Sequence, residues 1–203
     1  MTARSILAVF ARRDVLLPSF ASAACQFGVW AIVFAFLPLL AHEVGAGDVS
    51  VGLLMTVNLV ANTAANLFTT LRVRRENQSG CLFGSFGLFA AGALLASVSR
   101  SVAPMFAATA LMGIANGIFY PVLLGLSIER VDLPHRTTAM GIHQAIYAMG
   151  MFCGPWIGGV ISDSLGIRPM LAIMAGASVS LSSLLALLIP RAKAVEGNEV
   201  SAA

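Results

Sequence analysis

The sequence predicts an all-α membrane protein with six transmembrane helices. Of its 203 residues, 58% are hydrophobic and only 10% are charged, and the mean hydropathy is +0.89. The charged residues fall into clusters, and each uncharged segment between clusters exceeds the roughly 20 residues with which a helix crosses a bilayer. Helices are expected because backbone amides in hydrocarbon must be hydrogen-bonded within their own segment. The six segments are residues 15–41, 49–71, 77–99, 101–128, 137–162 and 169–190.

The Lys and Arg residues predict how these helices are oriented. Ten of the twelve lie on one side of the expected membrane, and only Arg100 and Arg168 lie on the other. Short cytoplasmic loops retain positive charge. We therefore expect an integral protein of the plasma membrane, the inner membrane of a bacterial cell, with both termini in the cytoplasm. The net charge of +3 is explained by these loops, so no nucleic-acid partner is expected.

The remaining bulk features divide the chain into three parts. Residues 1–13 form a basic cytoplasmic segment, residues 14–190 form the six-helix transmembrane bundle, and residues 191–203 form a polar, disordered cytoplasmic tail. The three cysteines lie inside expected spans without the spacing of metal ligands, so they are interpreted as small buried hydrophobic residues. No disulfide, metal or other cofactor is expected.

Polar side chains are distributed unevenly over the six segments. Asn, Gln, His, Tyr and Trp occur within segments 15–41, 49–71, 101–128 and 137–162, whereas segments 77–99 and 169–190 carry almost none. This pattern of two polar helices followed by a plain one, occurring twice, indicates two three-helix repeats. Successive triplets cross the membrane in opposite directions, so the repeats are inverted, with the polar helices facing an interior cavity.

The stretch GIHQAIYAMGMFCGPWIGG, residues 141–159, combines hydrogen-bonding side chains with glycines. At about 100° per residue, one narrow stripe of this helix carries both kinds of residue. Its polar half can face a cavity, and its glycine half lets a neighbouring helix approach closely. Pro155 is expected to kink the helix because it lacks an amide proton. The expected pivot residues are Gly150, Gly154, Pro155, Gly158 and Gly159.

Two stretches resemble a known family. TAMGIHQAIYAMGMFCGPWIGGVISDSLGIR, residues 138–168, resembles the penultimate helix and following loop of the major facilitator superfamily, the twelve-helix secondary transporters. AFLPLLAHEVGAGDVSVGLL, residues 35–54, resembles the seventh helix and outer loop of that family. The most specific piece, Gly154-Pro155-x-x-Gly158-Gly159, is similar to the antiporter motif of the fifth helix and to its counterpart in the eleventh.

The resemblance implies one six-helix half of such a transporter. The amino-terminal half usually carries an Asp-x-x-Gly-Arg-Lys/Arg loop, but the corresponding loop here reads LRVRRENQSG, with Arg74 where the repeat-related Asp163 aligns. No Asp, Glu, Lys or Arg lies within a span, so the carboxy-terminal half is favoured, and residues 1–13 then resemble the central cytoplasmic linker. The other half is supplied by a second copy, by a separate chain, or is lost.

The resemblance also implies a substrate site where polar side chains converge near the membrane midplane. The alternative for the asparagines is a hydrogen-bonded contact that only joins helices. His143 has two interpretations. It is either a neutral imidazole that hydrogen-bonds a neighbouring helix, or a group whose protonation couples proton binding to transport. The expected substrate-binding residues are Gln26, Trp30, Asn58, Asn62, Asn116, Tyr120, His143 and Tyr147.

The function implied is secondary active, alternating-access transport of a small organic solute. A cavity of amides and aromatics without fixed charge suits a neutral solute or a drug-like cation better than a strong anion. The alternative is a transport-inactive structural or regulatory subunit, or a remnant half-transporter. An intramembrane serine protease using Ser127 and His143 is not favoured, because Ile128 replaces the glycine that follows the serine in such enzymes. We therefore expect no enzymatic activity.

Overall fold

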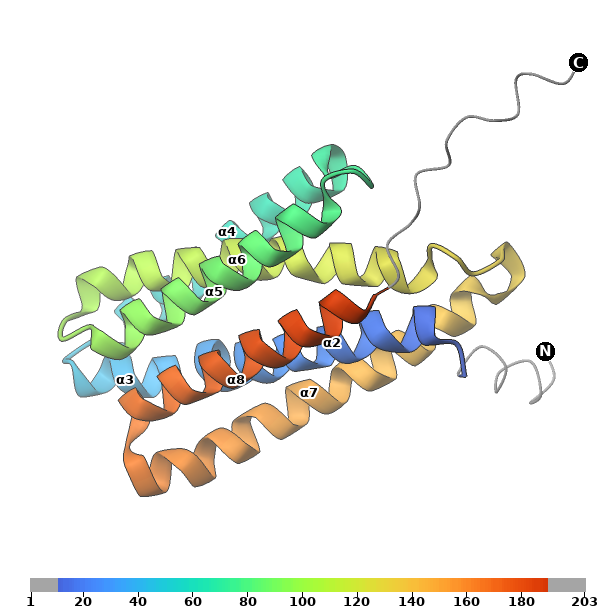
Figure 1. The fold of residues 1–203 in the computed structure, drawn as a ribbon. Coiled ribbons are helices and arrows are strands. Elements are labelled where there is room, and N and C mark those ends of the chain that lie inside the picture. Colours follow the sequence, from blue (N-terminus) through green and yellow to red (C-terminus); the bar gives the residue numbers. More distant parts are fainter. Residues whose placement is uncertain (1–10, 190–203) are drawn as a thin grey trace, which may run out of the picture.

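The structure, a computed structural model, describes residues 11–189, and within this range every regular element is a helix (Figure 1). The tail predicted at 191–203 and most of the predicted segment 1–13 lie outside the described residues. Among these described residues, six helices are long and apolar enough to cross a membrane. Each agrees with its expected segment to within three residues at both ends, so the prediction of six transmembrane helices is confirmed.

The helices follow one another with short connections. The first span is built from three consecutive elements, and a short 3-10 turn, η2 (Leu133–His135), precedes the fifth span. The elements of the first span are α2 (Arg13–Val29), η1 (Trp30–Phe36) and α3 (Leu37–Glu43), and the later spans are α4 (Asp48–Arg72), α5 (Gln78–Val98), α6 (Val102–Ile128), α7 (Arg136–Leu165) and α8 (Ile167–Leu188).

The first span contains a π-helical segment that the sequence analysis missed. At the end of η1, the amide of Leu37 donates to the carbonyl of Ile32, five residues earlier. Pro38 follows directly; it has no amide proton, and its ring disfavours the ordinary helical path over the preceding turn. The wider π turn accommodates this without ending the span.

The six spans form two layers. α2 and α6 are central: α2 contacts α7 and α8, α6 contacts α4 and α5, and α2 and α6 contact each other. The first layer is therefore the row α4, α6, α2, α7, and the second is formed by α5 and α8, which also contact each other. Exchanging α2 with α6, α4 with α7 and α5 with α8 leaves these contacts unchanged, whereas the contacts of α7 with α8 and with α6 have no counterpart of similar extent on α4. This agrees with two inverted three-helix repeats. The first helix of each repeat, α2 or α6, packs against the second and third helices of the other repeat.

Glycines set the spacing within the first layer. A Cβ added at Gly150 or Gly154 of α7 would overlap the carbonyl oxygen of Ala23 or Phe27 of α2. The close approach of a neighbouring helix expected for this ridge is therefore present, and the neighbour is α2. Gly158 continues the contact, with a Cβ position 3.1 Å from the ring of Phe36.

A second glycine pair joins α6 to α4. A Cβ at Gly113 or Gly117 would overlap the carbonyl oxygen of Asn58 or Asn62. The small-xxx-small spacing of Gly113 and Gly117 is visible in the sequence, but the sequence analysis did not use it. Both outer helices of the row thus dock on their neighbours through backbone contacts.

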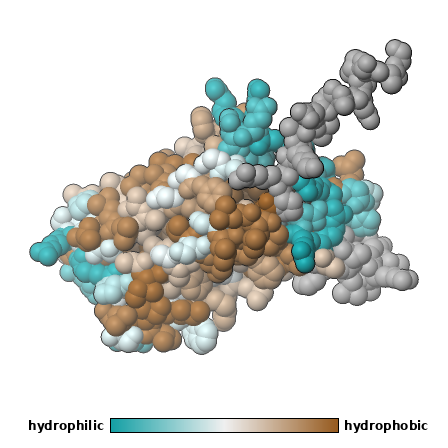
Figure 2. Space-filling view, in the orientation of Figure 1, coloured by the Kyte–Doolittle hydropathy of each residue, from teal (hydrophilic) through white to brown (hydrophobic). Residues whose placement is uncertain are grey.

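The surface matches a bundle that lies in lipid. Hydrophobic residues cover the middle of the visible face, and hydrophilic residues gather at its two ends (Figure 2). Met149, Phe152 and Trp156 of α7 are each more than half exposed, and they lie on the side of the helix away from its glycines. Because exposed apolar side chains of this size are tolerated in hydrocarbon, the outward side of α7 suits contact with lipid or another membrane segment.

Candidate functional site

An amide pair links the two central helices of the bundle. The Nε2 atom of Gln26 on α2 donates to the Oδ1 atom of Asn116 on α6 over 3.1 Å. Gln26 is only 2% exposed, whereas Asn116 is half-buried. The pair therefore satisfies Gln26 inside the protein and leaves part of the Asn116 amide accessible. In an apolar environment such a pairing avoids the cost of a buried amide without a partner.

One helical turn further along α6, an aromatic cluster bridges to α7. The rings of Tyr120 and Tyr147 have centroids 5.5 Å apart at 54°. Gln144 lies beside them, and its Nε2 atom donates to the hydroxyl of Tyr120 over 3.1 Å. Gln144 is exposed and both tyrosines are half-buried. Two phenol rings and an amide are thus accessible where α6 and α7 come together.

These side chains form a continuous set, which we call the polar strip. It crosses the three helices α2, α6 and α7, and Asn116 and Tyr120 connect its two parts because they are four residues apart on α6. The strip carries hydrogen-bond donors, acceptors and aromatic faces but no ionic charge. Its members are Gln26, Asn116, Tyr120, Gln144 and Tyr147.

His143 lies behind the strip, between α7 and α2. Its side chain is 0% exposed, and its Nδ1 atom lies 3.1 Å from the hydroxyl oxygen of Ser19. The Ser19 hydroxyl also lies 2.6 Å from the carbonyl oxygen of Val15 and can donate to it, in which case it accepts the proton of Nδ1. The Nε2 atom of the neutral imidazole is then an acceptor, and it has no hydrogen-bond partner among the described residues. The ring of Tyr147, a member of the strip, stacks on that of His143, with the two centroids 6.4 Å apart.

The asparagines of α4 separate into two kinds. Asn58 is 2% exposed, and its Nδ2 atom donates to the carbonyl of Thr109 on α6 over 2.9 Å. In this structure Asn58 joins two helices, which is the alternative that the sequence left open for the asparagines. Asn62 and Asn66 are half-buried, and within residues 11–189 their side-chain amides have no hydrogen-bond partner.

The structure brings some of the expected substrate-binding residues together and leaves others apart. Gln26, Asn116, Tyr120 and Tyr147 belong to the strip. Trp30 lies one helical turn beyond Gln26 on the same side of the span, with its ring 5.0 Å from that of Phe34. The other three residues have the separate positions given above: Asn58 and His143 are buried between helices, and Asn62 lies on α4. Contact of any of the eight with a substrate stays a prediction.

Two residues of the site were not among those expected. Gln144 lies in the stretch 141–159 but is not one of the eight expected residues, and Ser19 is not one of them either. Gln144 lies at the edge of the stripe that carries Tyr147, about 60° away around the helix, so a selection along the centre of that stripe leaves it out. Nothing in the sequence pairs Ser19 with a residue 124 positions away.

The geometry also bears on serine protease chemistry. Ser127 donates its hydroxyl proton to the carbonyl of Leu124 over 2.7 Å, one turn earlier on α6, and it is 1% exposed. The hydroxyl that contacts His143 belongs to Ser19 instead. Ser127 and His143 therefore do not form a nucleophile and base in this structure.

Comparison with known proteins identifies the family. The family model of the Major Facilitator Superfamily matches residues 19–203. An uncharacterized MFS-type transporter of Mycobacterium tuberculosis is 24% identical over 159 residues, which are 78% of this chain and 23% of that protein. Multidrug resistance protein MdtG of Yersinia enterocolitica is 27% identical over 152 residues, which are 72% of this chain and 36% of that protein.

The chain belongs to the major facilitator superfamily. It is an integral membrane protein, and its family is one of membrane transporters. The chain spans less than two fifths of the length of these relatives. Its six described spans agree with one half of the twelve-helix fold of that family.

Proposed function

We propose that this six-helix bundle is one half of a secondary active, alternating-access transporter for a small organic solute. The observation that carries the proposal is the polar strip, which exposes amide and phenol groups at the junction of α2, α6 and α7. In a membrane such groups are retained where they line a cavity or join helices. Gln144 and Tyr147 are accessible despite their internal contacts, which favours a cavity.

The chemistry of the strip favours a neutral solute or a lipophilic organic cation. Amides and phenols bind both through hydrogen bonds, and the two tyrosine rings attract a cation through their faces. No Lys or Arg lies in the interior of a span, away from its ends, to balance a strong anion. The name of the Yersinia relative, a multidrug resistance protein, fits this class of solute.

In this proposal the complete transporter contains a second six-helix half, which a second copy of this chain, a separate chain or a further part of the same polypeptide can supply. The relatives are roughly three to four times longer than the segments they share with this chain, which supports a larger functional unit. Crosslinking in native membranes tests this requirement. The bundle is expected to appear with a second half, and a strictly monomeric species with full transport activity would contradict it.

We also propose that both termini lie in the cytoplasm and that the protein lies in the plasma membrane, because ten of the twelve Lys and Arg residues lie at that end of the expected spans. Labelling of cysteines added at each end, in intact and in permeabilised cells, tests the orientation.

No catalytic role is proposed. Energy coupling by His143 is kept as a separate hypothesis, because this side chain is fully buried against Ser19.

Cysteine accessibility tests whether the strip faces water. In a variant lacking Cys25, Cys81 and Cys153, Gln144→Cys is expected to react with a membrane-impermeant thiol reagent. Met149→Cys is the matched control: it is on the same helix, about 140° away, and 61% exposed on the outward side, so it is expected to face lipid and stay unlabelled. Asn58→Cys controls for burial. Equal labelling at positions 144 and 149 would contradict a water-filled cavity at the strip.

Transport by the complete assembly tests the solute class. Tyr147→Ala is expected to weaken binding of a lipophilic cation roughly 2- to 30-fold, the range of a single cation–π contact, and Tyr147→Phe to keep most of it. Binding of a neutral solute is expected to depend on Asn116 and Gln144 instead. Unchanged cation binding in Tyr147→Ala would contradict the proposal that the tyrosine rings bind the cation.

The alternative is a transport-inactive structural or regulatory subunit, or a remnant of a longer transporter. The matched segments make up only 23% and 36% of the relatives' lengths, which favours this alternative as much as it favours a split transporter. The two are distinguished by reconstitution with and without candidate second halves. A stable complex with a complete transporter, without transport by the bundle in any combination of halves, would favour the regulatory subunit.

A further inference from the structure

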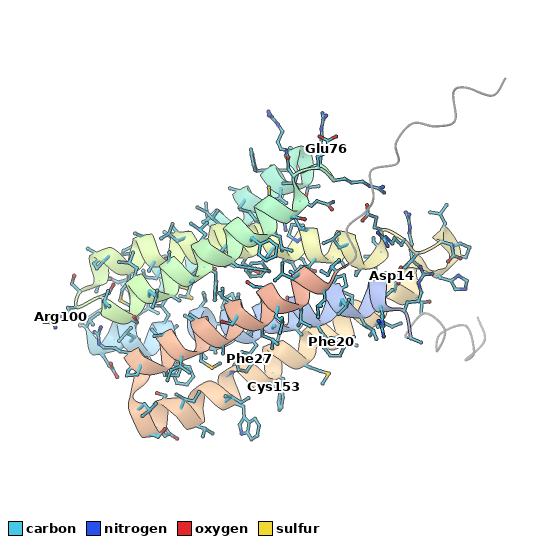
Figure 3. The ribbon with its side chains drawn as sticks, in the orientation of Figure 1. Asp14, Phe20, Phe27, Glu76, Arg100 and Cys153 are labelled. Atoms are coloured by element: carbon cyan, nitrogen blue, oxygen red, sulfur yellow. The ribbon has the colours of Figure 1, made fainter. Side chains whose placement is uncertain are left out.

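Some arginines of the bundle pair with a carboxylate, and others, such as Arg72 and Arg74, do not within residues 11–189. At the end where α2 begins, Arg12 pairs with Asp14 at 2.8 Å, and Arg75 pairs with Glu129 at 2.6 Å. At the opposite end, Arg100 and Arg168 have no carboxylate within salt-bridge distance in residues 11–189. Figure 3 shows Arg100 at the end opposite Asp14.

These two guanidinium groups line the same surface pocket. The pocket has a volume of about 470 Å³ and is lined by Ser97, Val98, Arg100 and Arg168. It is formed where α5 ends and α8 begins. Two cationic side chains without acidic partners therefore face one concave site at the edge of the membrane-spanning region.

The Arg168 side chain is held in place by the end of α5. Its Nη1 atom donates to the carbonyl oxygens of Ser97 and Ser99 over 2.9 and 2.5 Å. Gly166, with a φ of 86°, forms the turn that places the first residues of α8 beside this end of α5. The Nε and Nη2 groups of Arg168 have no hydrogen-bond partner in the described part of the chain, so they remain available to a ligand.

The pocket continues into an apolar surface. Val98 lines it and is 69% exposed, and Leu94, one turn earlier on α5, is 51% exposed. A ligand with a negative head and an apolar chain thus meets two guanidinium groups and then the outer side of α5. A guanidinium can bind a phosphate through two hydrogen bonds, because two parallel N–H groups match two phosphate oxygens.

We propose that this pocket binds the phosphate group of an anionic phospholipid. The site is open to the surface beside Val98, so the glycerol part of a headgroup can lie next to the bound phosphate. Binding ties the end of α5 to the start of α8, because the ligand contacts both helices. The site lies away from the polar strip, so the inference does not depend on the transport function.

Thermal unfolding in a neutral detergent tests the site. Phosphatidylglycerol is expected to raise the unfolding temperature of the purified chain, and phosphatidylcholine at equal concentration is not. Arg100→Gln is expected to weaken the apparent affinity for phosphatidylglycerol about tenfold, the size of one lost charged hydrogen bond. Arg168→Lys, which keeps the charge but loses the planar pair of donors, is expected to weaken it as well. Arg74→Gln, an exposed arginine at the other end, is the matched control.

Glycerol phosphate and inorganic phosphate separate the two sources of a phosphate group. Stabilisation by the lipid alone supports a phospholipid site. If the free anions stabilise the protein at similar concentrations, and Arg100→Gln abolishes this effect, the phospholipid proposal is wrong and the pocket binds a soluble phosphate. A lipid effect that is equal in the original protein, Arg100→Gln and Arg74→Gln overturns the site altogether.

Discussion

Replacement of Gly150 by alanine is expected to destabilise the bundle, although the same replacement at an open glycine does not. The added Cβ at position 150 meets the carbonyl oxygen, carbonyl carbon and Cα of Ala23, all backbone atoms that cannot rotate away. At Gly141, on the same helix, an added Cβ has nothing within 4 Å. The two sites share a helix and a residue type, so they differ mainly in the contact with α2.

The expected magnitudes follow from two opposing effects. Alanine in place of glycine stabilises a helix interior by about 1 kcal/mol. Extra atoms in a well-packed contact cost about 1–3 kcal/mol, and a contact with backbone belongs at the upper end because α2 and α7 must separate. Gly150→Ala is therefore expected to lower the free energy of unfolding by about 2 kcal/mol, the difference between these two effects, whereas Gly141→Ala is expected to raise it by up to about 1 kcal/mol.

Reversible unfolding in mixed micelles, followed by circular dichroism, measures both variants under the same conditions. Gly154→Ala serves as a second test, because its Cβ would meet the carbonyl of Phe27. If Gly150→Ala and Gly154→Ala are as stable as Gly141→Ala, the two helices are not held together by backbone contact along this ridge, and the reasoning fails.

Three further outcomes are expected. Asn58→Leu should lower stability by about 1 kcal/mol through loss of the hydrogen bond to the Thr109 carbonyl, and should leave solute binding unchanged; a selective loss of binding would instead place Asn58 in the substrate site. Arg75→Glu should cost less than about 1 kcal/mol, because the Arg75 side chain is 67% exposed, and adding Glu129→Arg should restore the loss; no recovery in the double variant would argue against this pair. His143→Gln should keep the pH profile of transport, because the imidazole is fully buried and held through Nδ1; a flattened profile would support a coupling role.

The sequence predicted the spans closely because the bilayer imposes a strict condition on local composition. Charged residues are costly in hydrocarbon, so Arg13, Glu43, Asp48 and Arg72 stand at the ends of the first two spans. The same condition revealed the repeats, since α5 and α8, in the second layer, lack Asn, His, Tyr and Trp, and Gln occurs in them only at the first residue of α5. The π-helical segment was not anticipated, because Pro38 disfavours an ordinary helical turn without specifying which wider or broken turn replaces it.

The tertiary structure alone decided which polar residues are accessible. Asn58 and Asn62 lie on one stripe of α4 and are equivalent in sequence, yet Asn58 is buried against Thr109 and Asn62 is half-buried without a hydrogen-bond partner among residues 11–189. His143 looked like a cavity residue, but it is closed off by α2 and bonded to Ser19. Helical periodicity gives the direction in which a side chain leaves its own helix, whereas burial depends on which neighbour packs there. The neighbouring helix is determined by contacts between distant segments, such as Gly150 with Ala23 and Gly117 with Asn62. A local pattern shows that a glycine permits close approach, but it does not specify which helix approaches.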